Sequence, residues 1–182
     1  MLKRRSEGRI SFYTSDAVFY NPLMEFNRDV ALLAVQVFQK EKQRPLLFCE
    51  PLAGCGVRGI RVALEVYGIQ EIYLNDRSLP AYKLIQQNIR LNQVQQKVKT
   101  ANEDANLFLN RHCATGTRFD VIDIDPFGSP APYIDSAIRS LKKRKSLLCA
   151  TATDMAPLCG IYPKACFRKY GGYPLRTRYC HE

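Results

Sequence analysis

The sequence lacks the features that would assign the chain to a membrane or to the cell exterior. Its longest apolar run, near Ala31 to Phe38, is interrupted by Gln36 and is far too short for a membrane span of about 20 residues. The first residues are charged and lead into no apolar segment, so we do not expect export. The seven cysteines are odd in number and include no Cys-X-X-Cys pair, which favours reduced thiols. We therefore expect a soluble cytoplasmic protein.

Metal-site and repeat signatures are also missing. Cys159, Cys166, Cys180 and His181 follow no spacing typical of a zinc site, so we expect no metal. There is no repeat or low-complexity stretch, and 46% of the 182 residues are hydrophobic, enough to bury a core. The length suits one domain, or one domain with a fragment of another.

What the sequence does have is an uneven excess of positive charge. The net charge is +10, yet residues 1–138 hold 17 basic and 15 acidic groups. Residues 139–182 hold 10 basic groups against Asp154 and Glu182, and aromatic residues such as Phe167 and Tyr179 lie among them. A basic end with interleaved aromatics favours a nucleic-acid partner, and a solubilising tail is the alternative. The basic residues in question are Lys142 to Lys145 and those from Lys164 to Arg178.

From residue 45 onward, short apolar runs alternate with helical patterns. We predict strands at 46–50, 71–75, 97–101, 119–125 and 146–151, and helices at 57–66, 78–91 and 132–142 with a short one through Leu107 and Leu109. This alternation is typical of an α/β fold with a parallel sheet. Ligands of such sheets bind outside the carboxyl ends of the strands, so functional residues should follow each strand.

Residues 1–44 precede the predicted sheet as an arm and a helix. The arm contains Phe12, Tyr13 and Phe19-Tyr-Asn-Pro22, and the helix runs from about Arg28 to Lys40. The arm is too rich in aromatics for a loose terminus, so we expect it to pack over the rest of the molecule.

A glycine-rich loop follows the first predicted strand. Gly54, Gly56 and Gly59 match G-X-G-X-X-G, whose glycines allow a tight turn and close approach of a ligand at a helix N-terminus. Asp76 closes the second strand, where a carboxylate can accept hydrogen bonds from ribose hydroxyls. The alternatives are a turn needing positive φ and a simple capping acid. NAD and S-adenosylmethionine fit this pattern equally.

Two segments bear on that choice. Glu50 to Ala53 separate the strand from the first glycine, whereas dinucleotide folds usually turn at once. Glu103-Asp104-Ala105-Asn106 follows the third strand and supplies an acid for an adenine amino group. Arg58 and Arg61 beside the loop could hold a phosphate or a carboxylate and do not discriminate.

Asp125-Pro126-Phe127-Gly128 after the fourth strand is the stronger discriminator. An exocyclic amine is a poor nucleophile because its lone pair is delocalised into the base. A carboxylate and a fixed carbonyl that accept its N–H groups aim the lone pair at an electrophile and stabilise the charge that develops. Pro126 fixes the carbonyl, and Phe127 can stack on a flipped base. The alternative interpretation of Asp125-Pro126-Phe127-Gly128 is a plain turn with an exposed acid. Of the neighbouring acids, we expect Asp120 to be solvated at the strand entrance, and we leave the role of Asp123 open.

A set of motifs in order along the chain resembles one enzyme family. The motifs are Phe19-Tyr-Asn-Pro22, Asn27-Arg-Asp29, Gly56-Val-Arg58-Gly-Ile-Arg61, Leu74-Asn-Asp76, Asp104-Ala-Asn106, Asp123-Ile-Asp-Pro-Phe-Gly-Ser-Pro130, Ala152-Thr-Asp154, Pro157-Leu-Cys-Gly160 and Cys180-His-Glu182. Together they resemble the S-adenosylmethionine-dependent tRNA guanine-N2 dimethyltransferases.

The resemblance implies a Rossmann-like class I methyltransferase fold, with a mostly parallel sheet and helices on both faces. It implies that S-adenosylmethionine is contacted by Arg28, Arg58, Asp76, Asp104 and Ala105, and that Asp125 is catalytic. The motifs themselves add Gly54 and Gly56 to the expected cofactor site, and Pro126 and Phe127 to the expected catalytic site. The substrate would be tRNA, with one or two methyl groups added to a guanosine between the D stem and the anticodon stem.

The same resemblance divides the chain into two parts. Residues 1–44 would be an arm and helix packing on a methyltransferase domain at 45–182, and five strands where the fold usually has seven suggest truncation before the last strands. Three alternatives remain: an amino-methyltransferase acting on another base or nucleic acid, a NAD-dependent dehydrogenase, and a non-catalytic tRNA-binding protein.

Overall fold

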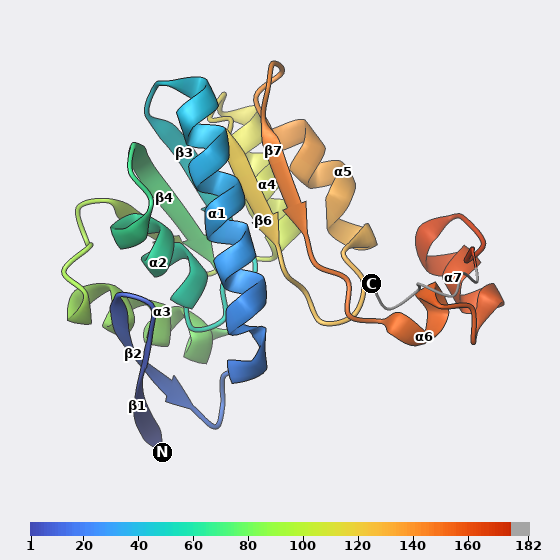
Figure 1. The fold of residues 1–182 in the computed structure, drawn as a ribbon, viewed down its shortest axis with the longest axis horizontal. Coiled ribbons are helices and arrows are strands. Elements are labelled where there is room, and N and C mark those ends of the chain that lie inside the picture. Colours follow the sequence, from blue (N-terminus) through green and yellow to red (C-terminus); the bar gives the residue numbers. More distant parts are fainter. Residues whose placement is uncertain (176–182) are drawn as a thin grey trace.

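A five-stranded parallel sheet forms the centre of the computed structural model, which describes residues 1–175 (Figure 1). The strands are β3 (Leu46–Glu50), β4 (Ile69–Asn75), β5 (Val98–Ala101), β6 (Val121–Ile124) and β7 (Leu147–Ala150), in the order β5-β4-β3-β6-β7. In the central strand, Cys49 is paired with Tyr73 of β4 on one side and with Ile122 of β6 on the other. The α/β fold and each predicted strand are thus confirmed, and the chain order reverses between β3 and β6.

Helices cover both faces of the sheet (Figure 1). On one face lie α1 (Glu25–Lys42), α2 (Val57–Glu65) and α3 (Leu79–Leu91), and on the other lie α4 (Ala105–Ala114) and α5 (Ala131–Ser140). Side chains alternate along each strand, so Phe48 and Ile72 join the first core while their neighbours Cys49 and Tyr73 join the second. Ser78 caps α3 by accepting from the Ala81 amide, as a residue of that type before a helix should.

The N-terminal arm is an antiparallel hairpin of β1 (Leu2–Glu7) and β2 (Ile10–Ser15). Phe12 is fully buried in the core that α1, α2 and α3 share. The hairpin itself was not predicted. After it, a short 3₁₀ helix η1 (Pro22–Met24) leads into α1, with Asn21 accepting from the Leu23 amide.

Asp120 contradicts its sequence prediction. It was expected to be solvated, but its side chain is fully buried at the start of β6. It accepts hydrogen bonds from Arg44, from the Leu47 amide (2.9 Å) and from Lys142 (2.7 Å). Burial acts to raise the pKa of Asp120, and these donors outweigh it and hold the pKa below its usual value. Asp120 thus links the beginning of β3 to the segment that precedes β7.

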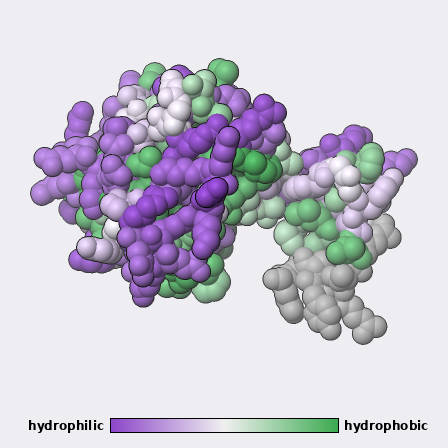
Figure 2. Space-filling model, turned by 90° about the horizontal axis from the view of Figure 1, so that it is seen from above, coloured by the Kyte–Doolittle hydropathy of each residue, from purple (hydrophilic) through white to green (hydrophobic). Residues whose placement is uncertain are grey.

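The segment after β7 extends beyond the sheet. It contains α6 (Met155–Leu158) and α7 (Pro163–Tyr170), which stand apart from the main body (Figures 1 and 2). Arg176, Arg178, Tyr179 and the Cys180-His-Glu182 motif, for which roles were expected, lie outside the described residues. Within residues 1–175, no helix is long and apolar enough to cross a membrane.

Candidate active site

The loops after β3, β4, β5 and β6 meet at the carboxyl edge of the sheet, where the sequence predicted the functional residues. Asn75, the fully buried last residue of β4, braces three of them. Its amide group donates to the carbonyls of Pro51 (2.9 Å) and Glu103 (3.0 Å), and its oxygen accepts from the Glu103 amide. Sequence reasoning did not single out this role, although a strand-terminal Asn inside an apolar run was its signal.

The glycine loop has the geometry that its three glycines predict. Gly54 and Gly56 have φ of +56° and +79°, in the left-handed region that favours glycine. A Cβ at Gly59 would lie 2.3 Å from Leu74 Cδ2, so this glycine lets α2 pack closely on β4.

Asp76 lies directly against this loop. Its Oδ2 accepts from the Gly54 amide (2.9 Å), and its Oδ1 accepts from the Ser78 amide (2.8 Å). These bonds fix the orientation of a half-buried carboxylate beside the glycines, and each of its oxygens keeps a second lone pair. The proposed ribose contact is compatible with this arrangement.

Asp104 and Ala105 begin α4. Asp104 is exposed and caps the helix through Oδ1, which accepts from the amides of Asn106 (2.9 Å) and Leu107 (3.2 Å). Its Oδ2 has no hydrogen-bond partner among residues 1–175. Ala105 is buried beneath it. Glu103 forms an ion pair with Arg111 (2.7 Å), which leaves Asp104 as the available acid of this loop.

A buried arginine joins the glycine loop to the loop after β6. Arg58, on the first turn of α2, donates to Asp123, to Asp125 Oδ2 (2.7 Å) and to Asn27 Oδ1 (2.9 Å). Asp123, whose role was left open, is therefore a buried counter-ion of Arg58. Arg58 was predicted to contact the cofactor, and its Nη atoms are committed to these side chains.

This cluster has more acidic than basic groups. Glu50 is buried beside Arg58 and accepts from the Gly59 amide (3.0 Å). Burial, reinforced by Asp123 and Asp125, raises the pKa of Glu50 to about 8. Burial and the nearby Asp125 raise the pKa of Asp123 to about 6. Within residues 1–175, Arg58 Nε and Asp123 Oδ2 are buried without a hydrogen-bond partner.

Arg28, on α1, is buried against the β1–β2 hairpin. Its Nε donates to Glu7 Oε1 (2.7 Å) and its Nη2 to Glu7 Oε2 (2.5 Å) and to the Asn21 carbonyl (3.2 Å). Tyr20 donates to the same glutamate (2.9 Å) and lies 5.1 Å from the guanidinium. The hairpin thus holds Arg28 in place, and its contact with a cofactor stays a prediction.

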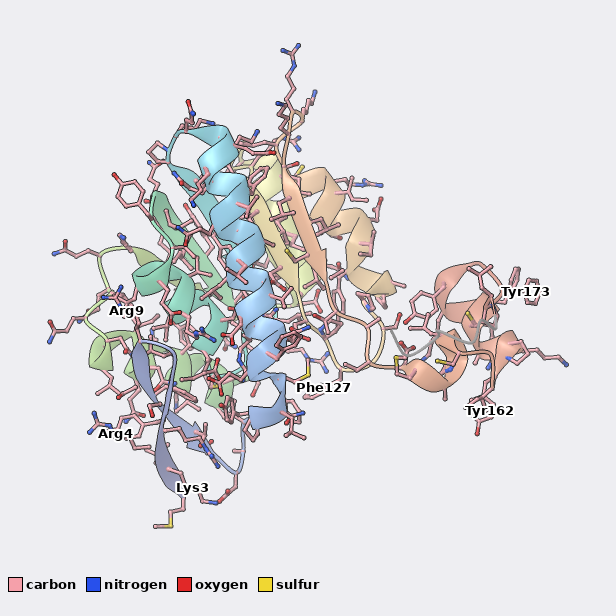
Figure 3. The ribbon with its side chains drawn as sticks, viewed as in Figure 1. Lys3, Arg4, Arg9, Phe127, Tyr162 and Tyr173 are labelled. Carbon is pink, nitrogen blue, oxygen red and sulfur yellow. The ribbon has the colours of Figure 1, made fainter. Side chains whose placement is uncertain are left out.

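The loop after β6 presents an acid and an aromatic ring to solvent. The Asp125 side chain is 26% exposed, and Oδ1 has no partner among the described residues. Phe127 is 77% exposed, and its ring meets Phe19 of the arm edge-on, with centroids 4.8 Å apart. Gly128 exchanges backbone and hydroxyl hydrogen bonds with Thr153, so the loop is tied to the segment after β7. Figure 3 shows Phe127 at the carboxyl end of the sheet.

The site also contains a cysteine thiol and side chains of the types that can ligate metals. Burial raises the pKa of the Cys55 thiol to about 12, so it is no nucleophile near neutral pH. Across residues 1–175 there is no group of three or more His, Cys, Asp or Glu side chains that could hold a metal ion. The expected absence of zinc ligands at Cys180 and His181 falls outside this range.

Comparison with known proteins agrees with the resemblance seen in the sequence. The family model for N2,N2-dimethylguanosine tRNA methyltransferase matches residues 2–182. The chain is 45% identical to a tRNA (guanine(26)-N(2))-dimethyltransferase of Methanobrevibacter smithii over 93% of this chain and 42% of the relative. It is 46% identical to that of Methanocaldococcus jannaschii, over 96% of this chain and 46% of the relative. The chain therefore spans less than half the length of these relatives.

Among solved structures, Trm1 from Pyrococcus horikoshii in complex with S-adenosyl-L-methionine is similar with a TM-score of 0.88 and 38% identity, over 99% of this chain and 50% of that one. The protein aTrm5 in complex with tRNALeu, at 17% identity and a TM-score of 0.64, shares the fold alone. The fold is thus Rossmann-like, as in S-adenosylmethionine methyltransferases, and it is truncated relative to these homologues. Because the family model matches nearly the whole length of the chain, the chain belongs to the N2,N2-dimethylguanosine tRNA methyltransferase family.

Proposed function

We propose that this chain transfers methyl groups from S-adenosylmethionine to the exocyclic N2 of a guanosine in tRNA, forming first the monomethyl and then the dimethyl base. Residues 45–182 would supply the methyltransferase domain, with residues 1–44 as an arm and helix packed on it. Membership of the family, the names of the relatives and the cofactor in the similar Trm1 structure support this proposal.

The residues of the site fit this cofactor better than a dinucleotide. A pyrophosphate would sit at the N-terminus of α2. There the Gly59 amide already donates to Glu50, and Asp123 and Asp125 add negative charge that would repel phosphates. S-adenosylmethionine supplies an electrophilic methyl group on a sulfonium, whose positive charge suits an acid-rich site.

We assign the binding of its parts to separate residues. Gly54 and Gly56 let the cofactor approach the backbone, and Asp76 would accept from the ribose hydroxyls. The unpartnered Oδ2 of Asp104 would accept from the adenine amino group, above Ala105. Either Arg28 or Arg58 would hold the carboxylate of the amino-acid part.

Asp125 would act on the amine of the base. Its Oδ1, which no described residue engages, would accept from an N–H of guanine N2 while the Pro126 carbonyl accepts from the other. These two acceptors aim the nitrogen lone pair at the methyl group and stabilise the positive charge that develops on the amine. The exposed ring of Phe127 would stack on the extruded base, with Phe19 at its edge.

The observation that most supports the proposal is the bond between Arg58 and Asp125. It holds the acid of the Asp-Pro-Phe-Gly loop against the helix that follows the glycine loop, so an acceptor for the amine lies beside a cofactor-type loop. Calorimetry with S-adenosylhomocysteine and transfer of tritiated methyl groups to unmodified tRNA, followed by nucleoside analysis, test it. We expect binding and labelled N2-methylguanosine and N2,N2-dimethylguanosine. Label on another base would mean that the substrate is not the guanine N2 amine. Cofactor binding without methyl transfer would mean that the chain is a non-catalytic protein.

A further inference from the structure

The β1–β2 hairpin carries a concentration of positive charge that the nearly balanced count of charges in residues 1–138 does not reveal. Lys3, Arg4, Arg5 and Arg9 are all exposed, whereas Glu7, the acid between them, is buried. Glu7 is fully used by Arg28 and by Arg61, whose Nη1 lies 2.9 Å from its Oε1. Every exposed charged side chain from residue 2 to residue 15 is therefore positive.

Most of this charge has no counter-ion. The side chains of Arg4 and Arg9 form no ion pair with any residue in 1–175, and Lys3 reaches only the exposed Asp16, at 3.6 Å. Arg5 donates to Thr14 Oγ1 (3.2 Å) and stacks over Tyr20, so its charge also stays unneutralised. Exposed cations of this kind are available to an external anion.

The hairpin is held rigidly, so these charges have fixed positions. Asn88 of α3 and Asn92, which caps the end of that helix, bond the backbone of β2 as a neighbouring strand would. Asn88 accepts from the Tyr13 amide (2.7 Å) and donates to its carbonyl (3.0 Å), and Asn92 does the same for Ser11 (3.2 and 2.6 Å). With the buried Glu7 clamp, these bonds fix the hairpin to α1, α2 and α3.

The open end of the hairpin, at Leu2 and Ser15, leads to the candidate active site, whereas its turn lies beside the last residue of α2, where the Arg9 amide donates to Glu65 (3.0 Å). The segment from Asp16 to Phe19 leads directly from β2 to the ring that touches Phe127. In the view of Figure 3, Lys3, Arg4 and Arg9 lie on one side of Phe127, and Tyr162 and Tyr173 lie on the other. Beside β1, Lys83 of α3 adds one further cation at the rim of a mostly apolar hollow of about 320 Å³ that Leu2 and Ser15 also line.

The loop at 143–145, expected from sequence to bind tRNA, is placed differently. Lys143, Arg144 and Lys145 are exposed, but they precede β7 and so lie at the amino end of a parallel strand. The active-site loops follow the carboxyl ends. Lys142 is moreover paired with the buried Asp120 (2.7 Å). This loop therefore points away from the site that a target base must reach.

We propose that the β1–β2 hairpin, through Lys3, Arg4, Arg5 and Arg9, is a docking surface for the phosphate backbone of the nucleic acid whose base enters the site beside Phe127. This inference rests on the proposed function, because that function makes the partner a tRNA. Phosphates that bind these cations release condensed counterions, so the contact contributes affinity that falls with salt concentration. It carries no sequence information and positions the strand that flanks the extruded base.

The test compares two triple variants that remove equal charge, one from the hairpin and one from the loop before β7. One carries Lys3→Gln, Arg4→Gln and Arg9→Gln, and the matched control carries Lys143→Gln, Arg144→Gln and Lys145→Gln. Affinity for unmodified tRNA is measured by filter binding over a series of salt concentrations. We expect the hairpin variant to reduce the slope of log K against log salt by roughly two to three units, at about 0.7–0.9 per phosphate contact, and the control to leave it nearly unchanged.

Equal slopes for the hairpin variant and the wild-type chain would overturn the inference, as would a larger effect in the control or no salt-dependent binding of tRNA by the wild-type chain. Aggregation of the hairpin variant with an unchanged slope would mean that the charges only protect the free edge of β1. Circular dichroism and S-adenosylhomocysteine affinity are measured on all three proteins. Both should be unchanged, which separates failure of this inference from failure of the proposed cofactor site.

Discussion

Replacing Arg58 with glutamine tests whether this residue acts chiefly as the counter-ion of the acidic cluster. The Arg58 side chain is 3% exposed and that of Asp123 is 1% exposed, so the change leaves a buried carboxylate without its partner. Removing one member of a buried ion pair costs about 3–5 kcal/mol. We expect the free energy of unfolding at pH 8, where Asp123 is ionised in the wild type, to fall by about that amount.

The loss should shrink as the pH falls. Arg58 lowers the pKa of Asp123, which burial and Asp125 raise to about 6, so its removal moves the folded-state pKa further up. The folded variant then binds a proton that the unfolded chain does not, and this recovers stability below the new pKa. A second substitution, Asp123→Asn, should likewise recover stability at pH 8, because it removes the uncompensated charge.

The assay is urea unfolding followed by far-UV circular dichroism, since the chain has no tryptophan. Arg90→Gln is the matched control, because Arg90 is exposed on α3 and should change stability by less than about 0.5 kcal/mol. A loss below about 1 kcal/mol at pH 8 for the Arg58 variant, with weaker S-adenosylhomocysteine binding, would refute the reasoning. Arg58 would then be foremost a cofactor ligand.

Three further predictions concern single residues. Asp76→Ala should weaken S-adenosylhomocysteine binding by roughly 1.5–3 kcal/mol in calorimetry, and unchanged affinity would remove Asp76 from the site. The pKa of Glu50, about 8 when folded against 4.5 when unfolded, predicts that stability falls from pH 5 to 8 by up to about 1.4 kcal/mol per unit. In urea unfolding, Glu50→Gln should remove the fall above about pH 6, below which the raised pKa of Asp123 also contributes, and a slope parallel to that of the wild type between pH 6 and 8 would contradict the prediction. Phe127→Ala should weaken tRNA binding by roughly 1–3 kcal/mol with unchanged cofactor affinity, and the reverse pattern would exclude stacking.

The sheet could be predicted because its signals are local. Leu46 to Glu50 and Phe119 to Asp125 are apolar runs between turn residues, and Ser78 marks a helix start in its own segment. β1 could not be predicted, since five of its six residues are exposed and the strand has no apolar alternation. What holds it in place is Glu7, and the partners of Glu7 lie 21 and 54 residues further along the chain.

In the candidate site, too, features with a local sequence signal could be predicted and features that join distant residues could not. The glycines and Asp76 were found because strand, loop and acid occur in order, whereas the ion pairs of the site join distant residues. Arg58 is 65 residues from Asp123, and Asp120 is 76 residues from Arg44. Asp120 was misjudged because an acid at a strand entrance is ordinarily solvated, and only the fold brings its cations to it.

The role of Asp125 is the central claim, and single-turnover methyl transfer to tRNA at saturating S-adenosylmethionine tests it most directly. Arg58 keeps Asp123 as a partner when Asp125 is changed, so the variants should fold and bind S-adenosylhomocysteine within a few-fold of the wild type. We predict that Asp125→Ala lowers the rate by on the order of 10²–10³, and that Asp125→Asn, which retains an acceptor oxygen without the charge, lies between alanine and aspartate. Near-normal rates for both variants, with N2-methylguanosine as the product, would contradict the account.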